Sequence, residues 1–142
     1  RRTARGADRR MGVVIAVGLD VVDLDRFRAA VERTPGLLDR LFTAGERTTA
    51  AERRDPIPSL AARFAAKEAV MKALGVGLGA FAWTDVEVGR VESGAPTLAL
   101  SGAAAARAGD AGVIDWHLSL THSGLVAAAV VLAVTSGVRP QM

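Results

Sequence analysis

Two acidic residues, Asp20 and Glu68, are the side chains whose type and setting point most directly to chemistry. Asp20 follows the apolar run 13–19, where a buried carboxylate is costly unless something neutralises it, although it could also cap a helix that starts near Asp23. No histidine-rich or cysteine-rich cluster accompanies the two acids. Two carboxylates suit a hard cation such as Mg²⁺, which keeps waters and takes phosphate oxygens as its other ligands. The pair therefore indicates a magnesium site that acts on a phosphate-containing substrate.

The helix predicted over residues 60–74 brings Glu68 together with two lysines. At about 100° per residue, Glu68 and Lys72 border the apolar stripe of this helix, and Lys67 lies near it. Unpaired burial of such charges is costly, so we expect a ligand or an ion to face them. The alternative is a solvated Glu68–Lys72 pair that contributes only a few tenths of a kcal/mol. The stripe consists of Leu60, Phe64, Met71 and Leu74.

Glycines after this helix and a polar strand further along the chain are candidates for phosphate contacts. Gly75 and Gly77 could let backbone amides approach an anion closely, although such glycines more often only form turns. Ser119 and Thr121 share one face of a predicted strand, and His122 follows at a turn. Hydroxyl and imidazole groups suit phosphate contacts. A serine nucleophile with His122 as its base is the alternative, but no third group is placed to orient the histidine.

The first half of the chain predicts one strand followed by helices. The run 13–19 suits a strand covered on both faces. Thr43, with Glu46 three residues later, is typical of a capping box. Ser59 is the predicted N-cap of the long helix, and Gly75 is its C-cap. In order, helices are expected to begin at Asp23, near Leu37, at Thr43 and at Leu60.

The second half of the chain predicts mainly strands. Strands are expected over residues 83–91 and 97–100, an alanine-rich helix over 102–108, and a closing β-hairpin from strands 116–121 and 125–134. Helices thus come early and strands late, after one initial strand. The predicted class is α+β, with a mainly antiparallel sheet packed against one long helix plus shorter helices.

Charge argues against a nucleic-acid partner once its location is considered. The formal net charge of +3 depends on residues 1–10, which hold five of the 18 basic residues and one of the 15 acidic ones. The rest of the chain carries a net charge of −1. It lacks the basic patch with stacking aromatics that a nucleic-acid module needs. We predict that residues 1–10 are a disordered or vector-derived extension before a natural start at Met11; a basic arm for an anionic partner is the alternative.

Composition predicts a single domain over residues 11–142. Half of the 142 residues are hydrophobic, which is enough for one buried core. The absence of cysteine excludes disulfides and fits a cytoplasmic location. No apolar run reaches the roughly 18 residues of a membrane span, so no membrane association is expected.

Three motifs follow one another along the chain. Gly18-Leu19-Asp20 is followed by Arg26, residues 63–75 read RFAAKEAVMKALG, and Ser119-Leu120-Thr121-His122 comes last. Together they resemble holo-acyl-carrier-protein synthase, a family of 4'-phosphopantetheinyl transferases, over residues 13–134. The middle motif is highly specific in combination with the other two and their order. The resemblance implies the 4'-phosphopantetheinyl transferase fold.

The resemblance also implies a reaction, in which the 4'-phosphopantetheine arm of coenzyme A moves to a serine of apo-acyl carrier protein and adenosine 3',5'-bisphosphate departs. Asp20 and Glu68 would bind Mg²⁺ together with the pyrophosphate of coenzyme A, and Lys72 would neutralise or protonate the leaving group. Glu68, directly or through a metal-bound water, would help remove the serine proton, although a metal ligand makes a poor base, so the identity of the base stays open. Coenzyme A contacts are expected from Arg63, Lys67, Gly75, Gly77, Ser119, Thr121 and His122.

Basic residues after Asp20 are candidates for binding the acidic carrier protein. These are Arg26, Arg28 and Arg40, with Arg26 the strongest, although surface arginines are common. The resemblance further implies a homotrimer with active sites at the subunit interfaces. The alternative to an enzyme is a non-catalytic module that binds acyl carrier protein or a nucleotide.

Overall fold

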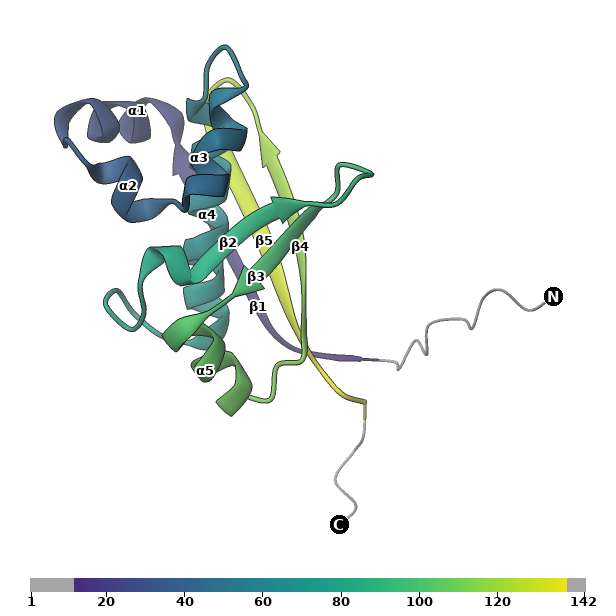
Figure 1. Cartoon of the computed structure of the whole chain (residues 1–142). Helices are drawn as coiled ribbons and strands as arrows, with labels where there is room; N and C mark the ends of the chain where they lie inside the picture. The colour runs from purple at the N-terminus through teal and green to yellow at the C-terminus, as the bar shows by residue number, and fades with distance from the viewer. Residues whose placement is uncertain (1–11, 138–142) are drawn as a thin grey trace.

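The computed structural model describes residues 12–137, and the α+β class predicted from the sequence is confirmed. One strand precedes four helices, after which strands dominate (Figure 1). The elements are β1 (Val13–Asp23), α1 (Leu24–Arg33), α2 (Leu37–Leu41), α3 (Ala44–Ala51), α4 (Ile57–Leu74), the 3₁₀ turn η1 (Trp83–Asp85), β2 (Val86–Arg90), β3 (Pro96–Leu100), α5 (Gly102–Asp110), β4 (Asp115–His122) and β5 (Val126–Thr135). The predictions for residues 1–10 and for Met11 lie outside the described residues. Between residues 12 and 137, no helix is both long and apolar enough to cross a membrane.

Two antiparallel sheets surround the long helix α4. The larger sheet has the strand order β1-β5-β4, and the smaller one pairs β2 with β3 (Figure 1). The predicted closing hairpin is confirmed, since His122 of β4 lies opposite Ala127 of β5 and the turn is closed by a hydrogen bond from the Ser123 N–H to the Val126 carbonyl (2.8 Å). The helices α1 to α3 lie near one end of α4, and α5 lies near the other (Figure 1).

Strand β1 departs from the prediction that both of its faces are covered. It is an edge strand whose side chains alternate, so that Gly18 and Asp20 face the protein interior while Val17, Leu19 and Val21 are exposed by 57–58%. The sequence run is apolar on both faces, and a single chain covers only one of them with α4. The outer face therefore carries an apolar surface.

Helix α4 begins earlier than predicted and is buried around most of its circumference. Its N-cap is Pro56 rather than Ser59, because the Asp55 carboxylate accepts a hydrogen bond from the Ile57 N–H (3.1 Å) and Pro58 needs no hydrogen-bond donor in the first turn. The predicted C-cap is confirmed, since Gly75 adopts the left-handed conformation at φ 68°. The capping box of Thr43 and Glu46 at the start of α3 is also confirmed.

The strand predicted over residues 83–91 is shorter in the structure. Its first residues form the 3₁₀ turn η1, and the strand β2 itself starts at Val86. The turn follows from local hydrogen bonding, because the Asp85 N–H bonds to the Ala82 carbonyl (3.0 Å) instead of to a neighbouring strand.

Gly18 sets how closely α4 approaches β1. A Cβ atom built on Gly18 would lie 1.8 Å from the carbonyl oxygen of Ala69 on α4, so no larger residue fits without moving the helix. Small residues on the facing side of α4, such as Ala65 and Ala69, are fully buried. The two backbones therefore meet directly at Gly18 and Ala69, which lie two residues before Asp20 on the strand and one residue after Glu68 on the helix.

Replacing Gly18 with alanine should lower the free energy of unfolding by about 1–3 kcal/mol or more, since the added methyl group overlaps the helix backbone. Gly109→Ala is the matched control, because a Cβ at this position in α5 meets nothing within 4 Å and alanine favours the helix. Chemical denaturation of both variants measures the difference. Equal stability of Gly18→Ala and the wild type would contradict the close approach.

Candidate active site

Asp20 and Lys72 form an ion pair between β1 and α4. The Lys72 Nζ donates to Asp20 Oδ1 at 3.0 Å and to the carbonyl oxygen of Leu19 at 2.9 Å. Asp20 is buried, whereas the Lys72 side chain is 57% exposed. The second oxygen, Asp20 Oδ2, is buried and has no hydrogen-bond partner among the described residues. A buried carboxylate oxygen of this kind has capacity for a further ligand.

Glu68 lies beside Asp20, one helical turn before Lys72. Burial and, after it, the negative charge of Asp20 together raise the pKa of the Glu68 carboxyl to about 7, while Lys72 opposes the shift. Two carboxylates so placed repel each other when both are ionised. Lys72 can balance only part of this charge, so the pair favours an additional cation.

The donor set of this pair fits Mg²⁺. It offers carboxylate oxygens only, one of them buried and without a hydrogen-bond partner among the described residues, and no third His, Asp or Glu joins the pair in residues 12–137. Mg²⁺ binds proteins through one or two carboxylates and completes its shell with waters and phosphate oxygens. The site therefore suits a metal that is shared with a phosphate ligand.

A cleft of about 620 Å³ opens in front of the two acids. It lies against α1, α2 and η1, and its wall combines apolar side chains with three arginines. The arginines are Arg26, Arg33 and Arg40; the apolar part includes Phe27, Phe64 and Trp83. Two of the three arginines predicted to bind a partner thus line the same cleft as Asp20 and Glu68. The third, Arg28, does not line it and forms an exposed ion pair with Asp55 instead (2.7 Å).

A second cleft, of about 310 Å³, collects Arg63, Thr121 and His122 with two further arginines. Burial lowers the pKa of Arg63, and the neighbouring positive charges of Arg90 and Arg53 lower it further. These positive side chains repel one another, and a multiply charged anion bound among them would relieve the repulsion. The sequence did not single out Arg53 or Arg90, because scattered arginines carry no local pattern.

The two clefts have no lining residue in common. Strand alternation places Ser119 and Thr121 on the outer face of the larger sheet, where Ser119 shares a row with Val130 and Leu19. Asp20 lies on the opposite face, in the row that contains Ala129. The predicted metal ligands and the predicted hydroxyl contacts therefore face different sides of the same sheet.

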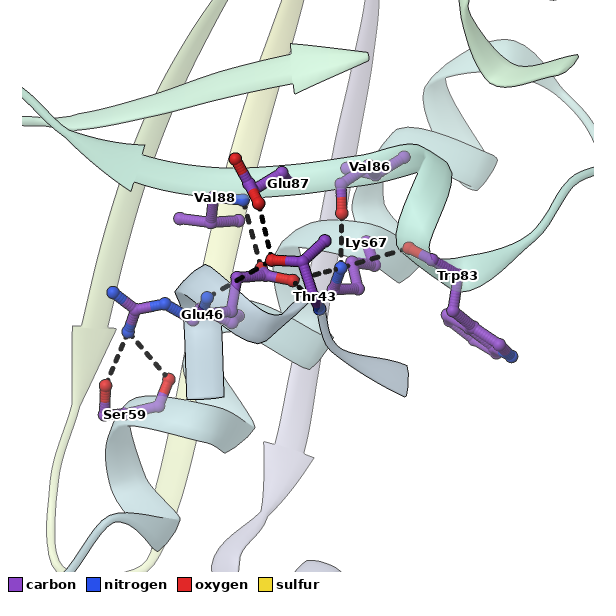
Figure 2. Close-up of polar contacts among 9 residues, drawn as sticks. Thr43, Glu46, Ser59, Lys67, Trp83, Val86, Glu87 and Val88 are labelled. Atoms are coloured by element: carbon purple, nitrogen blue, oxygen red, sulfur yellow. Dashed lines mark hydrogen bonds and ion pairs between the residues drawn. The ribbon is translucent and has the colours of Figure 1, made fainter. Parts of the chain in front are cut away.

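The phosphate contact predicted for Lys67 does not fit the structure. Its side chain is 0% exposed, and its Nζ donates to Glu46 Oε1 (2.8 Å), to the Trp83 carbonyl (3.0 Å) and to the Val86 carbonyl (Figure 2). The sequence predicts an external ligand or ion for Lys67, but Glu46 takes that place. The capping-box pattern indicates only the first role of Glu46, at the start of α3, and not its second role as the partner of a buried lysine.

The glycines after α4 have a more local role than predicted. The Gly75 N–H is bonded to the Lys72 carbonyl (3.1 Å), so this amide caps the helix and is not free to approach a phosphate. Gly77 lies in the following turn and borders neither of the two clefts. The prediction that Gly77 contacts coenzyme A stays a prediction.

The comparison with known protein families decides where this arrangement belongs. A family model described as the 4'-phosphopantetheinyl transferase superfamily matches residues 16–134. The chain belongs to this superfamily. The resemblance found in the sequence motifs is thereby confirmed, and the matched span contains both clefts.

Relatives of this transferase superfamily member are similar over most of its length. "Holo-[acyl-carrier-protein] synthase" of Streptomyces avermitilis is 56% identical over 120 residues, which cover 84% of this chain and 97% of the relative. A crystal structure of holo-(acyl-carrier-protein) synthase from Bacillus anthracis in complex with CoA (3',5'-ADP) is 31% identical with a TM-score of 0.72, covering 87% and 98% of the two chains. The synthase of Neisseria meningitidis is 28% identical with a TM-score of 0.77, covering 85% and 98%.

In metal-free buffer, the stability of this transferase superfamily member should fall relative to its Glu68→Gln variant as the pH rises. The raised pKa means that the folded state holds the Glu68 proton more tightly than the unfolded state does. In the unfolded state the carboxyl has its ordinary pKa of 4.5. This contribution is fully present below about pH 4.5 and is lost as the pH rises through about 7.

Thermal unfolding of both proteins in EDTA across this pH range provides the measurement. The wild-type Tm minus the variant Tm should decline toward neutral pH, because glutamine does not titrate. A Tm difference that stays constant with pH would show that burial and Asp20 do not raise the pKa of Glu68.

Proposed function

We propose that this chain transfers the 4'-phosphopantetheine group of coenzyme A to a serine of apo-acyl carrier protein and releases adenosine 3',5'-bisphosphate. The observation that carries the proposal is the pairing of Asp20 and Glu68, with Lys72 at their side, at the edge of a cleft that could hold a diphosphate. The names of the curated relatives and the coenzyme A bound to related structures support the same reaction.

Asp20 and Glu68 are the proposed ligands of Mg²⁺. When bound there, the metal would neutralise charge on the diphosphate of coenzyme A and make the β-phosphorus more susceptible to nucleophilic attack. The two acids, one on β1 and one on α4, would also fix where the diphosphate lies through the metal that they would hold. Positioning and charge neutralisation are the main needs of such a phosphoryl-type transfer.

Lys72 is proposed to act on the leaving group. In the reaction a bond forms between the serine oxygen and the β-phosphorus, and the bond from that phosphorus to the bridging oxygen breaks. The electron pair leaves with adenosine 3',5'-bisphosphate. The exposed, flexible Lys72 ammonium, held 3.0 Å from Asp20, can turn toward that oxygen to neutralise or protonate it.

Glu68 is the proposed acceptor of the serine proton, directly or through a water. Asp20 is the poorer candidate, because one of its oxygens is taken by Lys72 and the other is buried. Glu68 lines the cleft and is only partly buried, so a hydroxyl group could reach it.

The carrier protein is proposed to dock over α1 and α2. Arg26 and Arg40 line the cleft beside the two acids, so an acidic surface bound to them would bring its serine close to Glu68. The role that the sequence suggested for Arg28 is weaker, because Asp55 already pairs with it.

The transferase is proposed to act as a homotrimer with its active sites at the subunit interfaces. Support comes from the outer face of the larger sheet, where apolar Leu19 and Val21 flank the predicted coenzyme A contacts Ser119 and Thr121. Packing this face against a neighbour would bury the apolar surface. It would also allow the hydroxyls of one subunit to complete the acidic cleft of another.

The transfer reaction can be tested by mass spectrometry of apo-acyl carrier protein after incubation with coenzyme A and Mg²⁺. We expect the mass to rise by one phosphopantetheine group on a single serine. Glu68→Gln should slow this reaction by about 10²-fold or more, because it removes a metal ligand, and so should EDTA. Lys72→Met should slow it by about 10²-fold through the leaving group. An unchanged carrier mass with the intact protein would refute the proposed function.

The trimer can be tested by placing a charge on the outer face of β1. Leu19→Arg should convert the assembly to monomers, as measured by light scattering, and should lower the transfer rate in parallel, because a buried unpaired arginine is costly. Leu78→Arg is the control, since Leu78 is also exposed but lies in the turn after α4. A monomeric wild type with full transfer activity would contradict the shared site.

A further inference from the structure

Lys67 and Glu46 form a buried ion pair that has no part in the proposed transfer reaction. The Lys67 Nζ donates to one Glu46 oxygen at 2.8 Å and to the carbonyls of Trp83 and Val86, so three acceptors surround the ammonium group (Figure 2). Lys67 is 0% exposed, and Glu46 is also buried. A charge so deeply buried is costly unless its partners are complete, and here they are.

The carboxylate of Glu46 is equally well satisfied. Its Oε1 also accepts a hydrogen bond from the Thr43 N–H (3.0 Å), and its Oε2 accepts one from the Val88 N–H (3.0 Å). The pair thus links three elements: α3 through Glu46, α4 through Lys67, and the η1–β2 segment through backbone groups of both partners. Such a fully bonded network has one low-energy geometry, because any shift leaves a buried polar group unpaired.

The network fixes the helix next to a predicted metal ligand. Lys67 immediately precedes Glu68, and its side chain is anchored to α3 and to β2. Ala69 immediately follows Glu68, and its carbonyl lies against Gly18 of β1. The helix is therefore held by the residues on both sides of Glu68. These contacts fix the orientation of α4 about its own axis, and this orientation directs Glu68 toward Asp20.

The same lysine also holds one wall of the acidic cleft. It binds the carbonyl of Trp83, whose ring lies 5.0 Å from the ring of Phe64, which in turn lies 5.6 Å from the ring of Phe27. All three rings line the cleft that contains Asp20 and Glu68. One ammonium group thus connects a metal ligand with the aromatic wall beside it.

We propose that the Glu46–Lys67 pair is a positioning device for the transferase site, which sets the direction of Glu68 and the placement of Trp83. Both partners are buried away from the cleft and would not touch substrate, so both are positioning residues. The catalytic consequence rests on the proposed function, whereas the effect on Trp83 does not. The competing explanation is that the pair contributes to global stability alone.

The first experiment compares turnover per folded molecule. The variants are Lys67→Met and Glu46→Gln, of which the second keeps the size of the side chain. Val131→Ala is the control, because Val131 is fully buried but lies outside the cleft and outside the network. Folded fractions are measured by circular dichroism at the assay temperature, which is set well below the lowest Tm.

We expect kcat per folded molecule to fall about ten- to hundredfold in both network variants, since small misplacements of a reacting group have effects of this size. The KM for coenzyme A should change little, because other side chains are proposed to bind its phosphates. The double variant should be no slower than the slower single variant, because both substitutions break one contact. Val131→Ala should keep its kcat. Losses that follow the folded fraction equally in all variants would overturn the proposal.

The second experiment needs neither coenzyme A nor carrier protein. In a Trp116→Phe background, Trp83 is the remaining tryptophan, and acrylamide quenching reports how accessible its ring is. Lys67→Met and Glu46→Gln should increase the quenching constant at least about twofold, whereas Val131→Ala should not. Unchanged quenching in both network variants would overturn the proposal. If the wild type failed to transfer the arm, the proposed function would fall and quenching alone would decide the positioning role.

Discussion

The site depends on keeping two carboxylates together in a place where water screens them only partly. Asp20 is buried and Glu68 is half-buried, and the pKa of Glu68 is raised first by its own burial and then by repulsion from Asp20. Lys72 compensates for part of that charge from the exposed side. The contacts between β1 and α4 must therefore outweigh this repulsion. The absence of a side chain at Gly18 lets the two backbones pack directly against each other. A divalent cation bound there, as proposed, would take up the remaining negative charge and turn an unfavourable pair into a binding site.

Holding α4 so firmly requires contacts on the side that faces away from β1. There the Glu46–Lys67 pair links the helix to α3 and β2, and small alanines let the helix lie close to the sheet. Hydrophobic packing alone would tolerate small rotations of the helix, because apolar contacts have little directional preference. Hydrogen bonds and ion pairs do not tolerate them. The polar network is thus well suited to fix an angle, while the core supplies most of the stability.

Much of this arrangement could be predicted from the sequence, and the failures have physical causes. Asp20, Glu68 and Lys72 were found because an acid after an apolar strand and charges on a helix stripe are costly without partners. The same reasoning misassigned Lys67, because the helical wheel assumes one apolar face whereas α4 is buried around most of its circumference. Its partner Glu46 lies 21 residues away, a separation that no local pattern reveals. Ser59 was misplaced as the cap because the helix begins further upstream, at Ile57, with Pro56 as its N-cap and the Asp55 carboxylate bonded to the Ile57 N–H.

Each residue of the motif Gly18-Leu19-Asp20 has a separate structural role. Gly18 and Asp20 lie on the same face of β1, where the first lets α4 approach and the second meets Glu68. Leu19 points to the other face and contributes to the apolar surface beside Ser119. A shift of one residue in the pairing of β1 with β5 would exchange these faces, so the register of one strand sets the position of both the proposed metal ligand and the proposed surface for assembly. The irregularity between Val14 and Ala16 lies upstream of all three residues, and from Ala16 to Asp23 the pairing with β5 is continuous. The part of the strand that carries the motif is thus the part whose register is uninterrupted.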